Sequence, residues 1–144
     1  MNTPIKIWFT VFAIIAFGIR ITHAQSLNST QIKQIEEIAQ AIALQSNASS
    51  KEALDKSAVP NHTTAVGRNV RFEYVSLTKK GLAPTRIKVI ADAVWHQVFP
   101  RVCKANANNL AFDRGLYYTF IYLNNYGEKI TEFDVDKASC KGFY

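Results

Sequence analysis

Two segments of the chain repeat apolar residues at the spacing of a helix. In residues 29–45, five apolar side chains recur every three or four positions between polar ones: Ile32, Ile35, Ile38, Ala39 and Ile42. Residues 85–102 repeat this pattern with a wider face: Ile87, Ile90, Ala91, Val94, Trp95, Val98, Phe99 and Val102. The periodicity predicts two amphipathic helices whose apolar faces lie against a core.

The ends of these helices are also indicated by the sequence. Asn28 and Gln31 stand three positions apart and form a capping pair at the start of the first helix. Thr85 is the expected cap of the second helix, and Pro100 should kink or end that helix near Phe99 because proline lacks an amide donor. Residues 46–56 are small and polar, which is typical of a connector, with room for one further helical turn around residues 51–55.

Two other segments alternate apolar and polar residues, as strands do. Residues 66–77 place Val70, Phe72 and Tyr74 on one side, so we expect one or two strands within residues 63–78. Residues 114–136 predict a β-hairpin around the turn at residues 124–127. On one face of its first strand lie Leu116, Tyr118, Phe120 and Tyr122, and on the other face lie Tyr117, Thr119, Ile121 and Leu123. On one face of its second strand lie Thr131, Phe133 and Val135, and on the other face lie Ile130, Glu132 and Asp134.

Together these elements predict an α+β fold, with two amphipathic helices packed on a small antiparallel sheet. The 144 residues suffice for one domain with its own hydrophobic core. We divide the chain into a signal peptide (1–24), an N-terminal helix and connector (25–58) and an α+β core (59–144). Residues 25–144 are expected to form a single domain.

The first 24 residues have the anatomy of a secretory signal peptide. Lys6 precedes a nearly uninterrupted apolar run at residues 7–19, and small residues lead to Ala24. Cleavage is expected between Ala24 and Gln25, which predicts a periplasmic or secreted protein that meets the membrane only transiently. The alternative is an uncleaved, membrane-anchored structural component, although a bilayer core needs about 20 apolar residues and Arg20 interrupts this run.

The two cysteines, Cys103 and Cys140, both follow the signal peptide. An even number of cysteines in an exported protein predicts a disulfide bond. Together with only His62 and His96 they do not supply a convincing zinc site, so no metal and no cofactor is expected.

The distribution of charge argues against nucleic acid as a partner. The formal charge is +6, and loss of Lys6 and Arg20 with the signal peptide leaves +4. The basic residues are spread along the chain between acidic ones, whereas a nucleic-acid surface gathers them in a stripe. We therefore expect no nucleic-acid partner.

The sequence contains none of the common catalytic motifs. The chain has no G-x-S-x-G segment, phosphate-binding loop or calcium loop, so we assign no catalytic residue. One alternative is a small envelope hydrolase that uses His96 or the hairpin carboxylates Glu128, Glu132, Asp134 and Asp136. The simpler interpretation is a surface histidine and solvent-facing carboxylates.

The hairpin carries aromatic residues on both faces, and a sheet with one solvated face leaves some of them accessible. The candidate partner-binding residues are Tyr117, Thr119, Ile121 and Tyr126. Alternatively, Tyr117 packs under a helix or loop. The sequence thus favours a non-enzymatic periplasmic or secreted binding protein of the inhibitor, immunity or envelope accessory type, with a protein partner in the envelope that contacts the sheet face.

A pattern of spaced residues resembles a group of small, exported, largely uncharacterised proteobacterial proteins. It includes Val66-Gly67, the series Val70, Phe72, Tyr74 and Leu77, a helix ending at Cys103, Gly115, the series Tyr118, Phe120 and Tyr122, Gly127 and Cys140. The resemblance covers residues 59–140 and implies a periplasmic α+β protein without catalytic residues. Asn61 and His62 depart from it, because an acidic residue usually stands there.

Overall fold

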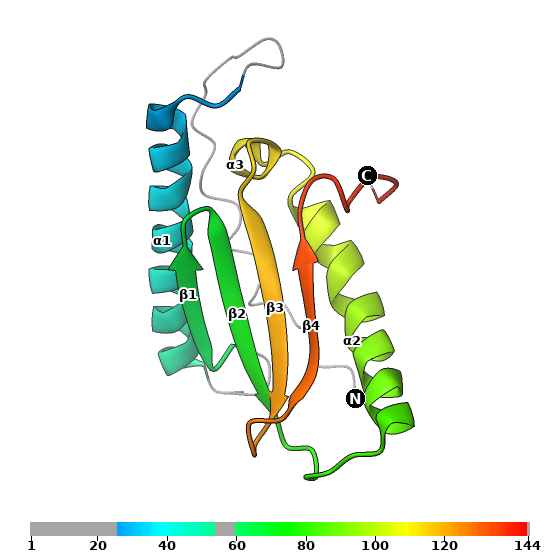
Figure 1. The fold of residues 1–144 in the computed structure, drawn as a ribbon. Coiled ribbons are helices and arrows are strands. Elements are labelled where there is room, and N and C mark those ends of the chain that lie inside the picture. Colours follow the sequence, from blue (N-terminus) through cyan, green and yellow to red (C-terminus); the bar gives the residue numbers. More distant parts are fainter. Residues whose placement is uncertain (1–25, 54–59, 144) are drawn as a thin grey trace.

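The computed structural model, which describes residues 26–53 and 60–143, places a helix before each of two pairs of strands (Figure 1). The elements are α1 (Ser29–Glu52), β1 (His62–Val66), β2 (Asn69–Ser76), α2 (Pro84–Ala105), α3 (Leu110–Asp113), β3 (Tyr117–Asn124) and β4 (Lys129–Val135). Figure 1 shows α1 along the β1 side of the sheet and α2 along the β4 side. The predicted α+β class is confirmed, and the predicted signal peptide lies outside the described residues.

The four strands form one sheet in the order β1-β2-β3-β4. The outer pairs, β1 with β2 and β3 with β4, are antiparallel, and the central pair β2 with β3 is parallel. The sheet is therefore mixed and not wholly antiparallel as predicted. The reason is the position of α2, which carries the chain from the end of β2 back to the start of β3 and so allows a parallel pair.

One face of this sheet forms the core with both long helices. The register aligns Val70 with Tyr118 and Phe72 with Phe120, as the predicted alternation requires. The core cluster joins these strands to Ile35, Ala39 and Ile42 of α1 and to Phe99 and Cys103 of α2. Because both helices pack on this inner face, no described helix packs on the opposite, outer face.

Burial of three tyrosines in this core affects their ionisation. Removal from water raises the pKa of Tyr122 to about 12 and raises that of Tyr118 and Tyr74 well above 10. The Tyr118 hydroxyl donates to Oδ1 of Asn106 at 3.1 Å, so its polar end is satisfied inside the core. These rings therefore remain neutral and serve the packing of the sheet.

Helix α1 begins as predicted but extends beyond the expected end near Gln45. Oδ1 of Asn28 accepts from the Gln31 amide at 2.8 Å, and Oε1 of Gln31 accepts from the Asn28 amide at 3.0 Å. The helix then continues to Glu52, through residues predicted to be a connector. Contacts with β1 explain the extension: Ser46 Oγ lies 2.8 Å from Oγ1 of Thr63, and Asn47 also bonds to β1.

Helix α2 differs from prediction at both ends. Ala83, without a side-chain cap, occupies the N-cap position that we expected for Thr85, and Pro84 starts the helix. Pro100 does not end the helix, which continues to Ala105. Proline removes one amide donor, but the following turn is held by Asn106, whose Nδ2 donates to the Val102 carbonyl at 2.9 Å.

An asparagine side chain protects the free edge of β1 at Thr63. Nδ2 of Asn47 donates to the Thr63 carbonyl at 2.7 Å, and its Oδ1 accepts from the Thr63 amide at 2.8 Å. The carboxamide thus bonds to both backbone groups of Thr63, as a neighbouring strand would. Edge strands need such protection because unpaired backbone groups recruit other chains.

We expect Asn47→Ala to lower the free energy of unfolding by about 2 kcal/mol and to promote aggregation, because the Thr63 amide and carbonyl lose their partners. Urea unfolding and light scattering measure the two effects. The matched control is Asn125→Ala at an exposed loop position, which should change neither. Equal stability of the two variants would contradict the proposed edge protection.

Within the described ranges, no helix combines the length and the apolar character needed to cross a bilayer.

Candidate binding surface

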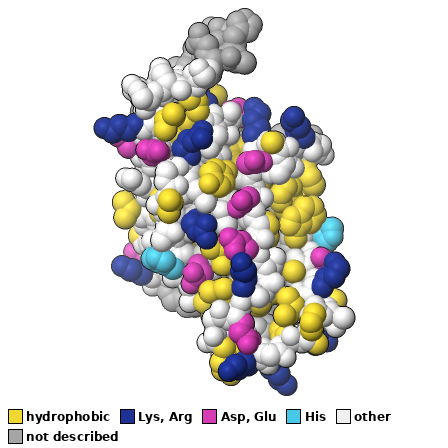
Figure 2. All heavy atoms as spheres, viewed as in Figure 1, with side chains coloured by type: hydrophobic (Ala, Val, Ile, Leu, Met, Phe, Trp, Pro, Cys, Tyr) yellow, Lys and Arg dark blue, Asp and Glu magenta, His cyan; other side chains and the backbone are white. Residues whose placement is uncertain are grey.

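The outer face of the sheet presents a continuous surface built from three strands. Its residues are Arg71, Glu73 and Val75 of β2, Tyr117, Thr119, Ile121 and Leu123 of β3, and Glu132 and Asp134 of β4. Figure 2, seen in the view of Figure 1, shows basic and acidic side chains intermixed down the middle of this face. The surface therefore combines half-exposed apolar side chains with charges of both signs.

A hydrogen-bonded group of three side chains lies at the centre of this surface. The Thr119 hydroxyl donates to Oδ1 of Asp134 at 2.6 Å and accepts from Nδ2 of Asn69 at 3.0 Å. Thr119 and Asn69 are buried, with 2% and 6% of their surface exposed. One bond joins β3 to Asn69 of β2, and the other joins β3 to Asp134 of β4. The group therefore fixes side-chain positions across the three strands.

An ion-pair group lies beside it. Glu132 is 3.6 Å from Arg71 and 2.9 Å from Lys129 at the closest nitrogen–oxygen approaches. The hydrogen bond from Lys129 is the main reason that the pKa of Glu132 lies below its usual value, with Arg71 contributing less. Glu132 therefore stays ionised at neutral pH.

The four predicted partner-binding residues do not all lie together. Tyr117 and Ile121 are half-buried and lie on the outer face of β3. Thr119 lies between them but is buried, so its role is to organise the surface. Tyr126 belongs to the β3–β4 loop, beyond the end of the face, and is 60% exposed.

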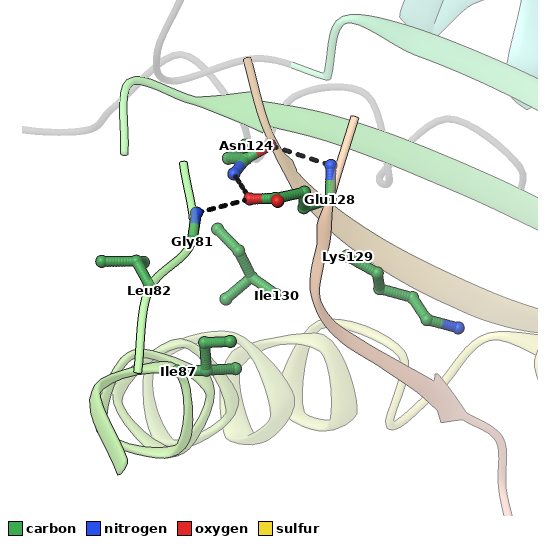
Figure 3. Close-up of a pocket in the computed structure, with 7 residues that line it drawn as sticks. All are labelled: Gly81, Leu82, Ile87, Asn124, Glu128, Lys129 and Ile130. Atoms are coloured by element: carbon green, nitrogen blue, oxygen red, sulfur yellow. Dashed lines mark hydrogen bonds between the residues drawn. The ribbon is translucent and has the colours of Figure 1, made fainter. Parts of the chain in front are cut away.

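The β3–β4 loop is held by two hydrogen-bonded side chains beside a shallow pocket of about 240 Å³ (Figure 3). Oε2 of Glu128 accepts from the Gly81 amide at 3.0 Å and from Nδ2 of Asn124 at 2.6 Å. The Gly81 bond is the larger cause of a lowered pKa at Glu128, followed by the Asn124 bond. These groups bond to one another, so their role is to fasten the loop to the segment that precedes α2.

Ile130 in this pocket corrects one sequence-based prediction. Alternation assigned it to the outer face with Glu132 and Asp134, but it is buried, with 8% exposed, and points toward Ile87 of α2 (Figure 3). The cause is an irregularity in the ladder between Tyr122 and Leu123, which shifts the register of β4. A β-bulge of this kind interrupts the period-two alternation.

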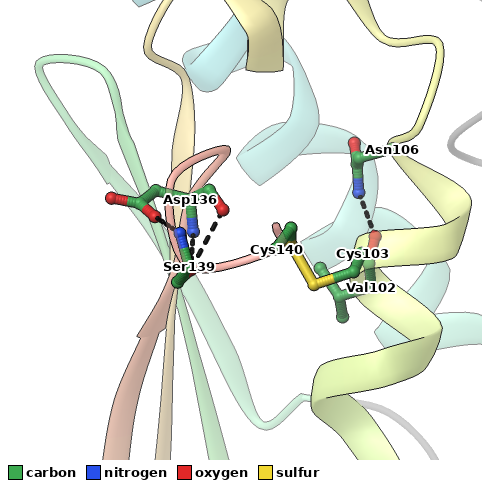
Figure 4. Close-up of a disulfide and its surroundings, with 6 residues drawn as sticks. All are labelled: Val102, Cys103, Asn106, Asp136, Ser139 and Cys140. Carbon is green, nitrogen blue, oxygen red and sulfur yellow. Dashed lines mark hydrogen bonds between the residues drawn. A yellow bond between two sulfur atoms is a disulfide. The ribbon is translucent and has the colours of Figure 1, made fainter. Parts of the chain in front are cut away.

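The predicted disulfide joins α2 to the segment after β4 (Figure 4). The sulfur atoms of Cys103 and Cys140 are 2.01 Å apart, and both residues are fully buried. A turn positions Cys140: the Ser139 amide donates to Oδ1 of Asp136 at 2.6 Å, and the Cys140 amide donates to the Asp136 carbonyl at 3.1 Å. The bond is therefore part of the core and is remote from the outer face.

The residues considered for hydrolysis do not form a catalytic arrangement. His96 is exposed on α2, with its ring 5.1 Å from that of Trp95. The pKa values of Glu128, Glu132 and Asp136 lie below normal, mainly through hydrogen bonds from Gly81, Lys129 and Ser139 respectively, whereas a general acid needs a raised value. Among the described residues, no group of three potential ligands could hold a metal ion.

Comparisons with known proteins identify the fold. The chain matches no family model and no curated protein. A predicted secreted protein from Pseudomonas aeruginosa has a similar structure, with a TM-score of 0.61, 14% identity and coverage of 80% of this chain and 100% of the other. Two pilotins of type II secretion systems are also similar. The pilotin EpsS of Vibrio vulnificus gives a TM-score of 0.55 with 19% identity, covering 79% of this chain and 98% of its own. The pilotin AspS of Vibrio cholerae gives a TM-score of 0.53 with 23% identity, covering 78% of this chain and 97% of its own.

Proposed function

We propose that this protein is a non-enzymatic binding protein of the bacterial envelope, periplasmic or secreted after cleavage near Ala24, that contacts a protein partner through the outer face of its sheet. The observation that carries the proposal is the difference between the two faces. Both long helices cover the inner face, while the outer face keeps apolar and aromatic side chains half-exposed on a hydrogen-bonded support.

The composition of the outer face suits protein recognition. Tyr117 and Ile121 supply apolar contact area, and the bonds of Thr119 to Asn69 and Asp134 restrict movement before a partner arrives. A pre-organised surface loses less conformational entropy on binding, so more of the contact energy contributes to affinity. Tyr126 is proposed to extend the contact at the loop end of the face.

The similar structures support the envelope assignment through shared architecture. One is a predicted secreted protein and two are pilotins of type II secretion systems, so this arrangement of helices and sheet occurs in proteins linked to secretion. We propose an accessory role of that general kind for this chain. We also propose that residues 25–144 form one mature domain, because α1 shares its core cluster with α2 and the sheet.

Site-specific photocrosslinking in the native envelope tests this function. A crosslinker at position 121 on the outer face is expected to yield one discrete adduct. The control crosslinker replaces Leu44, which is 72% exposed on α1 and should yield none. Adducts from position 44 but not from position 121, or none from either, would contradict the proposal.

A further inference from the structure

The two edges of the sheet differ in how their backbone groups are protected. At β1, the Asn47 side chain bonds to both the amide and the carbonyl of Thr63. At the other edge, β4 pairs only with β3, so backbone groups of alternate residues point away from the sheet. Within residues 26–53 and 60–143, no side chain or loop bonds to those groups at residues 131–135. Among the described residues, the β1 edge is therefore protected at Thr63, whereas no hydrogen bond protects the β4 edge at residues 131–135.

Helix α2 provides an apolar wall beside the β4 edge. It lies along the β4 side of the sheet in Figure 1, and Figure 2 shows hydrophobic side chains gathered on that side. Trp95 stacks on Phe99 with ring centres 4.7 Å apart, and Phe143 lies 5.3 Å from Phe99 while 39% exposed. Phe133 faces the core from β4 but is only half-buried, as expected where the sheet ends.

The other side of β4 carries carboxylates, one of which has no cationic partner among the described residues. Glu132 and Asp134 point to the outer face, and Asp136 follows the strand. Glu132 is paired with Arg71 and Lys129, whereas Asp134 accepts from Thr119 and forms no ion pair among the described residues. A strand added here would place every second side chain next to these carboxylates and the intervening ones above α2.

We infer that the β4 edge binds an extended segment of a partner protein by strand addition, and that this segment alternates cationic with apolar side chains. The inference rests on the proposed binding function and adds its geometry. Backbone hydrogen bonds to β4 supply affinity, and the two rows of side chains supply specificity. Cationic residues lie beside Asp134 on the outer face, and apolar residues lie against Trp95 and Phe143.

The charges of β4 disfavour a second copy of this chain as the occupant. A symmetric antiparallel pairing of the whole strand is centred on Glu132 and sets Glu132 directly opposite its own copy. Centring the pair on Phe133 sets Glu132 opposite Asp134 of the copy. Like charges directly opposite destabilise a strand pair, so these registers are unfavourable and a cationic partner segment fits better.

A synthetic peptide of alternating valine and lysine is the probe, with amide NMR spectra and hydrogen exchange of the purified protein as readouts. We expect the peptide to shift and protect amides of residues 131–135 and to leave β1 unchanged. N-methylation at every second peptide bond removes the backbone donors and should abolish binding. Asp134→Asn keeps an acceptor for Thr119 and should weaken binding about two- to fivefold. Glu37→Gln, the same charge change at an exposed position of α1, is the control and should have no effect.

Three results would overturn the inference: no protection of β4, equal binding of the N-methylated peptide, or a dimer in sedimentation whose β4 amides are protected without peptide. If the peptide leaves β4 unchanged while position 121 still crosslinks to a partner, only strand addition is excluded. If crosslinking also fails, the proposed binding function is excluded with it.

Discussion

Removing the Cys103–Cys140 bond is expected to lower the free energy of unfolding by about 4 kcal/mol. The two cysteines are separated by 37 positions, so the bond closes a long loop and restricts the unfolded chain. For a domain of this size the loss corresponds to a fall in Tm of roughly 10–20 °C. The double variant Cys103→Ala/Cys140→Ala avoids placing free thiols or hydroxyls in the core.

Thermal unfolding with and without reductant measures this effect. The wild-type protein should lose stability in reductant, and the double variant should be insensitive to it. Partner binding should persist below the lowered Tm, because the bond lies in the core and remote from the outer face. Identical unfolding of the wild-type protein with and without reductant would show that the bond does not stabilise the fold.

Phe72→Ala is expected to cost about 3–5 kcal/mol, because it removes a large side chain from the centre of the core. Phe72 is 2% exposed, and its ring stacks on that of Phe120 at 5.3 Å and lies 6.0 Å from that of Tyr118. The matched control is Val75→Ala, on the same strand but half-exposed on the outer face.

Urea unfolding of both variants compares the two faces of β2. We expect the loss for Phe72→Ala to be several times that for Val75→Ala, since only the first leaves a buried cavity. Equal losses would contradict the assignment of the inner face to the core and of the outer face to the surface.

Period-two alternation predicted the inner face of the sheet correctly. Val70, Phe72, Tyr118 and Phe120 share the core as expected, because burial on one side of a strand repeats every second residue. The disulfide was predictable for a different reason, since the two cysteines are the only ones in a chain whose first residues predict an export signal. Both inferences depend on local or compositional signals.

Features that depend on distant contacts were not predictable. Nothing near Asn47 in the sequence indicates that its side chain would pair with Thr63, and this tertiary contact extends α1 beyond Gln45. The parallel pairing of β2 with β3 depends on how α2 crosses the sheet. Ile130 was misplaced because a bulge leaves no clear signal in an alternating sequence.

The candidate surface was predicted in part. Tyr117 and Ile121 share a face because of alternation, but the burial of Thr119 depends on Asn69 and Asp134, which approach it from two other strands. Sequence spacing does not indicate which strands are neighbours, so this support could not be derived. The same holds for the difference between the two sheet edges.

The most direct test of the central claim compares partner capture by matched surface variants. Ile121→Thr keeps a β-branched side chain in β3, and Tyr126→Ser changes an exposed loop position, so both variants should unfold at the wild-type temperature. We predict that their combination reduces capture of the crosslinked partner at least tenfold, while Leu44→Ser on α1 leaves capture unchanged. Undiminished capture by the double variant, or a loss caused by Leu44→Ser, would contradict binding through the outer face of the sheet.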